Sequence, residues 1–497
     1  MKADFRRIAD VSILYFIQAG LISAQISTAM ATKAQTAPDE FRDHISTVDA
    51  AGKRLWVYPR RPKGKLYDYR KWVSYGLLAF LFAGPFIKIN GLPLLMLNVV
   101  ERKFVIFGIL FWPQDFFILV LAFLAMLVFI ILFTVVYGRL FCGWVCPQTI
   151  FLEMVFRRIE YAIEGDYNKQ KALDKMPWNN EKVLKKISKT VLFLLISFII
   201  ANTFLAYVIG IEELQKIVIE GPFVHVGGFV TLLVFTGIFY WVFAYFREQV
   251  CTIVCPYGRL QGVMLDKKSV SVAYDYIRGE PRRKLHKGQE RTEGDCIDCN
   301  QCVQVCPTGI DIRNGAQQLE CINCTACIDA CNDIMRMIGK PEDLIRFDSE
   351  EGIAESKKWK LFTPRVMGYS AILVLLLTVL STLLLTRDDA QATILRTPGQ
   401  LYQKTDQGTV RNLYNISVIN KTNHDMPLKL KLLSGEGAIN VIGSEMVLPA
   451  QGIAEGVFFA EIPLNQIKGM NSEIEIGVYH GDELITTQDT KFLAPAK

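Results

Sequence analysis

Long blocks of apolar residues alternate with charged stretches over most of this 497-residue chain. A helix of roughly 20 apolar residues crosses the hydrocarbon core of a bilayer, which is about 30 Å thick. The block 116–133 contains no charged or strongly polar side chain, so it does not suit an ordinary soluble helix. The pattern therefore predicts a multi-pass α-helical membrane protein with about five spans. The predicted spans are 72–89, 116–137, 190–210, 228–246 and 366–386.

After residue 390 the apolar pattern changes to a period of two. Tyr414, Ile416 and Val418 alternate with polar residues, and the same alternation recurs at 428–432 and 474–478. Short alternating runs separated by turn residues, such as Ser434 and Gly435, are typical of antiparallel strands. The pattern predicts a small C-terminal β-sandwich, which contains no cysteine.

Lysine and arginine are distributed unevenly among the connections. Eight lie in 53–71, ten in 138–189 and eighteen in 247–365, against three in 88–115 and one in 211–227. Because positively charged connections stay in the cytoplasm, we predict that the amino end and the stretch 256–365 are cytoplasmic and that the C-terminal domain is periplasmic. The formal net charge of +6 then reflects this bias beside anionic membrane lipid, and no nucleic acid is needed to explain it.

The first 50 residues allow two interpretations. Lys2, Arg6 and Arg7 precede an apolar run at 11–24, which resembles a secretory signal. Cleavage after that run would carry the basic segment 53–71 across the membrane, against the positive-inside rule. We therefore prefer a peripheral or non-native extension, with Met30 as a candidate start.

Eight of the twelve cysteines form two copies of the run CxxCxxCxxxC, displaced by 25 residues. This spacing is typical of a chain with two [4Fe-4S] clusters, in which three thiolates of each run bind one cluster and the fourth binds the other. Zinc sites pair CxxC units instead, and a cytoplasmic location disfavours disulfides. The spacing assigns Cys296, Cys299, Cys302 and Cys331 to cluster one, and Cys321, Cys324, Cys327 and Cys306 to cluster two.

The other four cysteines form a second repeat, CxxxCP, at the ends of two predicted spans. The pairs are Cys142 with Cys146 and Cys251 with Cys255, followed by Pro147 and Pro256. Residues four apart share one face of a helix, so each pair directs two sulfurs the same way. The prolines favour a break in the helix at that point.

If the spans pack together, these four thiols meet at the edge of the membrane. Such a site suits Cu(I), another iron–sulfur centre, or redox cycling through a disulfide, and the spacing does not separate the three. Cysteine is also a common small apolar filler in membrane helices. Two copies with the same trailing proline and an upstream arginine favour a functional site.

Other chemistries lack support in the sequence. None of the five histidines lies inside a predicted span, which argues against an intramembrane b-type haem. The chain has no GxxxxGK[ST] loop and no GxGxxG after a predicted strand, so neither nucleotide hydrolysis nor a Rossmann site is indicated.

The predicted organisation has six parts. They are an extension (1–50), a basic cytoplasmic segment (51–71), a four-helix membrane domain with both CxxxCP motifs (72–255), a cytoplasmic α+β ferredoxin domain (256–365), a fifth transmembrane helix (366–386) and a periplasmic β-domain (387–497).

Four phrases together resemble one family, the cytochrome c oxidase accessory proteins CcoG, also called FixG or RdxA. They are RLFCGWVCPQT (139–149), REQVCTIVCPYGRLQ (247–261), YDYIRGEPR (274–282) and the cysteine block 294–332. The resemblance extends from about Tyr58 to the carboxyl terminus, and it implies that the β-domain is immunoglobulin-like. Residues 1–50 fall outside it, and Asn332 stands after Cys331 where the ferredoxin phrase has proline.

The resemblance implies a bacterial inner-membrane protein that helps to assemble cbb-type cytochrome c oxidase by reducing Cu(II) to Cu(I). Its implied cofactors are two [4Fe-4S] clusters, with copper as a further candidate, and the CxxxCP cysteines are candidates for copper contact or electron handover. The implied partners are oxidase subunits or copper-delivery proteins and an unidentified electron donor. Two alternatives stay open, an electron-transfer subunit between quinone or a cytoplasmic donor and a periplasmic reductase, and a non-enzymatic assembly scaffold.

Overall fold

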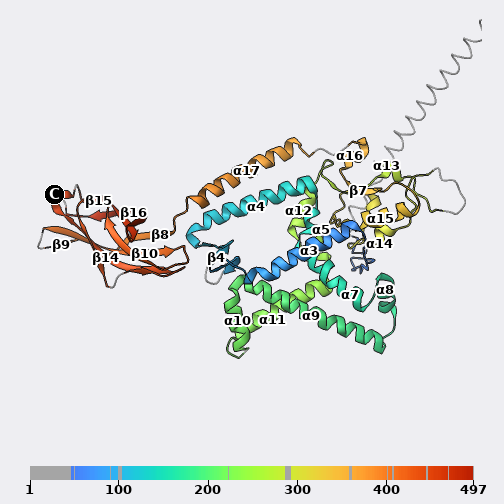
Figure 1. The fold of residues 1–497 in the computed structure, drawn as a ribbon, viewed down its shortest axis with the longest axis horizontal. Helices are drawn as coiled ribbons and strands as arrows, with labels where there is room; N and C mark the ends of the chain where they lie inside the picture. Colours follow the sequence, from blue (N-terminus) through green and yellow to red (C-terminus); the bar gives the residue numbers. More distant parts are fainter. Residues whose placement is uncertain are drawn as a thin grey trace, which may run out of the picture. The chain divides into compact units, whose positions relative to one another are not determined.

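The computed structural model describes residues 46–495 except 50, 90, 99–102, 222, 286–292, 358–360, 400, 406–407, 444–445 and 468. The predicted signal-like extension and the candidate start at Met30 lie outside the described residues. Figure 1 shows the path of the chain.

Internal contacts divide the chain into two compact units, each assembled from three separate stretches. The first unit comprises Met1–Arg70, Tyr137–Lys182 and Arg247–Trp359, and the second comprises Lys71–Val136, Val183–Phe246 and Lys360–Lys497. All twelve cysteines therefore belong to the first unit. The predicted boundary at 255/256 separated the CxxxCP motifs from the ferredoxin cysteines, whereas the structure groups them together.

Among the described residues, four helices are long and apolar enough to cross a membrane. They are α4 (Phe116–Tyr137), α9 (Asn180–Ile209), α11 (Val226–Trp241) with its π-helical continuation Val242–Phe246, and α17 (Pro364–Leu385). Exposed apolar side chains cover most of these helices, as expected for contact with lipid. Helix α17 begins where the Thr363 hydroxyl accepts a hydrogen bond from the Val366 N–H, with Pro364 in the first turn.

The first predicted span, 72–89, differs from the structure in its bounds. Helix α3 runs over Lys65–Ala83, gives way to a 3₁₀ turn at Gly84–Phe86, and is followed by strand β1 from Lys88. Its first half carries four charged residues, which leaves a short apolar part. The helix ends there because Pro85 has no N–H to donate to the Leu81 carbonyl, which instead accepts a hydrogen bond from the Tyr207 hydroxyl at 2.8 Å. The count of five spans stays a prediction.

The second unit also contains one further helix and two small sheets. Helix α10 covers Ile211–Glu220. Strands β1 (Lys88–Ile89) and β2 (Leu92–Pro93) pair with each other, and β3 (Leu95–Asn98), β4 (Lys103–Ile106) and β5 (Ile109–Phe111) form an antiparallel sheet.

The carboxyl-terminal part of the second unit is a β-sandwich, as the alternating pattern predicts. One sheet has the order β12-β14-β10-β8 with β9 beside β10, and the other has the order β13-β11-β15-β16. Tyr414, Ile416 and Val418 on β10 and Ile474, Ile476 and Val478 on β15 are buried between the sheets. The strands are β8 (Ala390–Arg396), β9 (Gln403–Lys404), β10 (Thr409–Asn420), β11 (Met426–Leu432), β12 (Ala438–Ile442), β13 (Val447–Leu448), β14 (Ile453–Pro463), β15 (Asn471–His480) and β16 (Glu483–Leu493).

The first unit is made of short helices and one two-stranded sheet. Strand β6 (Ser271–Tyr274) pairs antiparallel with β7 (Ile345–Asp348). The helices are α5 (Leu140–Trp144), α6 (Pro147–Ile150), α7 (Arg157–Ile163), α8 (Tyr167–Lys175), α12 (Pro256–Met264), α13 (Tyr276–Gly279), α14 (Gln301–Gln304), α15 (Ala326–Met337) and α16 (Glu350–Glu355). The first ferredoxin cysteine run passes through α14, and the second passes through α15.

Candidate functional site

Left-handed backbone conformations recur in the two ferredoxin cysteine runs with the same 25-residue period as the cysteines. In the first run Asp298 and Asn300 have φ of 49° and 57°, and in the second Asn323 and Thr325 have φ of 52° and 67°. These left-handed residues occupy equivalent places, 25 residues apart, and each pair directly precedes a helix. Left-handed residues tighten each CxxCxxC loop, so that its three sulfurs turn toward one point.

Two cavities of about 350 Å³ each collect the eight ferredoxin cysteines. The first is lined by Cys306, Cys321, Cys324 and Cys327, and Cys302 also reaches it. The second is lined by Cys296, Cys299, Cys302 and Cys331. The fourth cysteine of each run thus faces the cavity of the other run, which is the crossed arrangement predicted from the spacing.

Burial makes these thiols poor anions in the absence of metal. It raises the pKa of Cys302, Cys321 and Cys331 to about 12 each. Neighbouring thiols add to the rise, since thiolates grouped together would repel one another. A cationic iron centre removes both penalties, because a coordinating thiol loses its proton to the metal.

A single shared metal ion fits these residues less well. Within the described part of the chain, no three His, Cys, Asp or Glu side chains lie close enough to hold one ion together. A [4Fe-4S] cluster places each thiolate on a different iron, so its ligands stand farther apart. None of the twelve cysteines forms a disulfide. The cavities, the thiol groups and their spacing therefore fit iron–sulfur clusters.

The crossed arrangement can be tested by pairing cysteine substitutions. We expect Cys299→Ala with Cys331→Ala to leave about four iron atoms per chain, because both residues serve the same [4Fe-4S] cluster. The matched pair Cys299→Ala with Cys306→Ala disrupts both clusters and leaves almost none. Iron and sulfide analysis of anaerobically purified protein measures the difference. The reverse ranking of the two pairs would show uncrossed ligation.

The two CxxxCP segments have the same local structure. Cys142 lies in α5 and Cys251 in the π-helical segment Val250–Val254. Cys146 and Cys255 are extended, with ψ of 123° and 112°. Each immediately precedes a proline that opens the next helix, and a residue before proline is driven out of the helical region. The predicted break in both segments is therefore confirmed.

The structure brings the four CxxxCP cysteines together. Burial, followed by the neighbouring thiols of Cys146, Cys142 and Cys255, raises the pKa of Cys251 to about 12. Burial likewise raises the pKa of Cys142 to about 11, with Cys146 the next cause. The Cys142 thiol also donates a hydrogen bond to the Gln261 side chain, at 3.3 Å. We call these four residues the thiol tetrad.

The thiol tetrad adjoins the loop of the second ferredoxin run. Cys142 packs against a core cluster that contains Ile322 and Cys324, and the Trp144 indole donates to the Asn323 carbonyl at 3.3 Å. Gly143 lies so near the Ile322 carbonyl that a Cβ there would collide with it. Glycine at 143 thus permits the close approach of the two segments.

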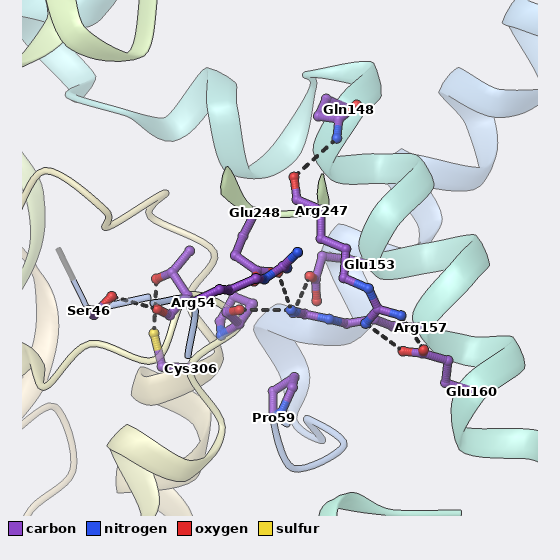
Figure 2. A network of polar contacts seen from close by, with 12 residues as sticks. Ser46, Arg54, Pro59, Gln148, Glu153, Arg157, Glu160, Arg247, Glu248 and Cys306 are labelled. Carbon is purple, nitrogen blue, oxygen red and sulfur yellow. Dashed lines mark hydrogen bonds and ion pairs between the residues drawn. The ribbon is translucent and has the colours of Figure 1, made fainter. Parts of the chain in front are cut away.

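A buried network of ion pairs ties the same segments together (Figure 2). Arg157 pairs with Glu153 and with Glu248, the latter at 3.3 Å, and Glu248 also pairs with Arg54 at 3.2 Å. Arg247 forms a separate pair with Glu160, at 3.0 Å through its Nη1. These residues follow Cys146 and precede Cys251, so the network holds both CxxxCP segments at their outer ends.

The network also reaches the ferredoxin loop. Arg157 donates a hydrogen bond of 2.9 Å to the carbonyl of Pro307, the residue after the cluster ligand Cys306 (Figure 2). Its side chain is 2% exposed and carries the charge of a permanently protonated guanidinium. One buried side chain therefore connects both CxxxCP segments to a predicted cluster ligand.

Two other buried arginines lie closer to the cysteines. Arg139 donates to the carbonyls of Leu319 and Gly258, and Arg70 donates to the Gly143 carbonyl at 2.7 Å. An arginine precedes both CxxxCP motifs in the sequence, and this repeat indicates Arg139. Nothing in the sequence indicates Arg70, because it lies 73 residues from Gly143.

Family models match three parts of the chain. Residues 246–350 match a 4Fe-4S dicluster domain, residues 119–163 a 4Fe-4S binding domain, and residues 380–495 the IG-like fold at the C-terminal of FixG. The iron–sulfur assignment and the immunoglobulin-like type of the β-sandwich are thereby confirmed. Neither copper nor an oxidase is named in these matches.

Curated relatives match most of the chain. Protein RdxB of Cereibacter sphaeroides is 35% identical over 407 residues, which cover 78% of this chain and 82% of that protein. Protein RdxA of the same organism is 31% identical over 77% of this chain and 83% of its own length. Nitrogen fixation protein FixG of Rhizobium meliloti is 32% identical over 74% of this chain and 77% of its own.

Proposed function

This chain belongs to the FixG/RdxA family of membrane iron–sulfur proteins, and from that premise we propose that it reduces Cu(II) to Cu(I) for the assembly of a cbb-type cytochrome c oxidase. The observation that carries the proposal is the contact between the thiol tetrad and the second ferredoxin loop. Cys142 of the tetrad packs against the core cluster that contains Cys324, a predicted iron–sulfur ligand, and the Trp144 indole donates to the Asn323 carbonyl. A one-electron centre and a group of soft ligands thus adjoin each other.

Each group of cysteines has its own part in this reaction. The eight ferredoxin cysteines hold two [4Fe-4S] clusters, which supply one-electron transfer when bound. Two thiols of the tetrad receive each copper ion, because sulfur ligands prefer Cu(I) over Cu(II) and favour the reduced product. The reaction consumes one electron per ion and needs no proton.

Burial of the tetrad makes copper binding depend on pH. The Cys142 and Cys251 thiols have pKa values of about 11 and 12, so they are protonated at neutral pH without metal. Binding of a copper ion displaces those protons and neutralises the thiolates that remain. We therefore expect copper binding to strengthen as the pH rises.

The partners and the location complete the proposal. The ferredoxin residues face the cytoplasm, where an unidentified donor supplies electrons, and the β-sandwich faces the periplasm of a bacterial inner membrane. We expect the β-sandwich to contact oxidase subunits or copper-delivery proteins, because it exposes edge strands and holds no cysteine.

Anaerobic EPR tests the proposal. The purified protein is reduced with dithionite, freed of excess reductant and mixed with Cu(II), whose signal should disappear for about two ions per chain, one for each [4Fe-4S] cluster. Protein that is not pre-reduced is the control, because free thiols also reduce Cu(II) by forming disulfides. Equal loss of signal in both samples contradicts the proposal. Oxidation of quinol by a protein that leaves Cu(II) unchanged would indicate the reductase-linked alternative.

A further inference from the structure

Arg70 and Arg139 are buried cations without an ion-pair partner. Their exposed fractions are 1% and 5%. Throughout the described residues, no carboxylate oxygen lies within 4 Å of either guanidinium. One nitrogen of each, Nη2 of Arg70 and Nε of Arg139, is buried without a hydrogen-bond partner. Buried charges in proteins are normally paired, so these two require an anion.

Other buried arginines in the same unit are paired. Arg157 contacts Glu153 and Glu248, and Arg313, beside the other cavity, contacts Asp298 and Asp311 at 2.7 Å each. The carboxylates cancel the charge of Arg313 where it lies near Cys302. The two cavities therefore differ in their electrostatic surroundings, although their cysteine sets are alike.

The anions that face the two unpaired arginines are sulfurs. Arg70 acts electrostatically on Cys324. Arg139 lies among Cys142, Cys321 and Cys251, and Glu320 acts on it from beyond 4 Å. Even if the Glu320 carboxylate neutralises one of the two arginines, one positive charge remains, and only the cysteine sulfurs are left to balance it.

We propose that Arg70 and Arg139 raise the reduction potential of the cluster held by Cys306, Cys321, Cys324 and Cys327 above that of the cluster held by the other four ferredoxin cysteines. Reduction of a [4Fe-4S] cluster adds one electron and no proton, so its negative charge grows by one. A nearby buried cation stabilises that added charge, because the low-dielectric interior screens it weakly.

The difference in reduction potential sets the direction of electron transfer between the two clusters. The higher-potential cluster is the one whose loop contacts Cys142, so electrons collect beside the thiol tetrad. The Arg139 guanidinium lies between that loop and the tetrad, and it acts on sulfurs of both. The inference rests on the cluster assignment within the proposed function, but it does not depend on copper.

Potentiometric titration followed by EPR, with dithionite as the one-electron donor and no copper present, tests the proposal. In Arg139→Gln and Arg70→Gln, we expect one of the two midpoint potentials to fall by at least about 59 mV, which is a tenfold change in the ratio of reduced to oxidised cluster. Arg139→Lys and Arg70→Lys keep the charge and should restore most of the potential. Arg313→Gln, the matched control, should leave that midpoint unchanged.

The outcomes distinguish an electrostatic role of the two arginines from a purely structural one. If both glutamine variants keep both midpoints, the proposal is wrong. Iron analysis accompanies each titration. Loss of iron from the glutamine variants but not from the lysine variants supports a cation required by an anionic cluster. Equal loss from glutamine and lysine variants shows a purely structural role and overturns the proposal. Failure of Cu(II) reduction in the wild type would not alter either midpoint, so the two proposals fail independently.

Discussion

Replacing both Cys251 and Cys255 with serine should abolish Cu(II) reduction and leave the iron content at about eight atoms per chain, the number in two [4Fe-4S] clusters. The two residues supply half of the thiol tetrad, and serine hydroxyls bind Cu(I) poorly. Neither cysteine lines a ferredoxin cavity, so both clusters should persist. Loss of the Cu(II) EPR signal measures the reaction, and iron analysis measures the clusters.

A neighbouring substitution provides the control. Val254 lies between the two cysteines in the same π-helical segment and is 58% exposed. Val254→Ser should reduce copper like the wild type. Unchanged copper reduction in the cysteine variant would reject the tetrad as the copper site. Loss of about four iron atoms would show that the tetrad holds a further [4Fe-4S] cluster, the alternative that the spacing leaves open.

Arg157→Met should destabilise the first unit by about 3–5 kcal/mol. The substitution leaves Glu153 and Glu248 buried with a single remaining cation, Arg54, and it removes the hydrogen bond to Pro307. Uncompensated buried carboxylates are costly, because the interior solvates charge poorly. Urea unfolding of the anaerobic protein, followed by loss of cluster absorbance, measures the change in free energy.

An exposed arginine is the matched control for this substitution. Arg336 also contacts two carboxylates, Asp333 and Glu342, but its side chain is 60% exposed. Exposed ion pairs contribute about 0–1 kcal/mol, so Arg336→Met should shift unfolding little. Equal effects of the two substitutions would contradict a special role for the buried network.

The sequence predicts well what short-range spacing encodes. Cysteines three residues apart within one loop must face the same cluster, and the crossed lining of the two cavities follows from the repeat. Alternation at Ile474, Ile476 and Val478 directly gives the buried face of a strand. The prolines after Cys146 and Cys255 likewise fix the local break.

Contacts between distant segments escape this kind of inference. Arg70 looks like an ordinary member of a basic connection, and the CxxxCP repeat singles out Arg139 without indicating its partners. Only the fold shows that each meets a carbonyl far along the chain. The grouping of the CxxxCP segments with the ferredoxin residues was missed for the same reason, since hydropathy assigned them to the spans. Helix α3 was misjudged in its bounds because its end depends on a contact at Tyr207.

The discontinuous first unit has a consequence for biosynthesis. The Leu319 carbonyl that receives Arg139 is 180 residues further along the chain. At a translation rate of about 5–20 residues per second, the ribosome needs roughly ten to forty seconds to deliver it. During that interval two candidate spans, α9 and α11, are made while Arg139 and Cys142 wait for their loop. Iron–sulfur loading therefore belongs to the end of synthesis, when the nascent protein is already anchored in lipid.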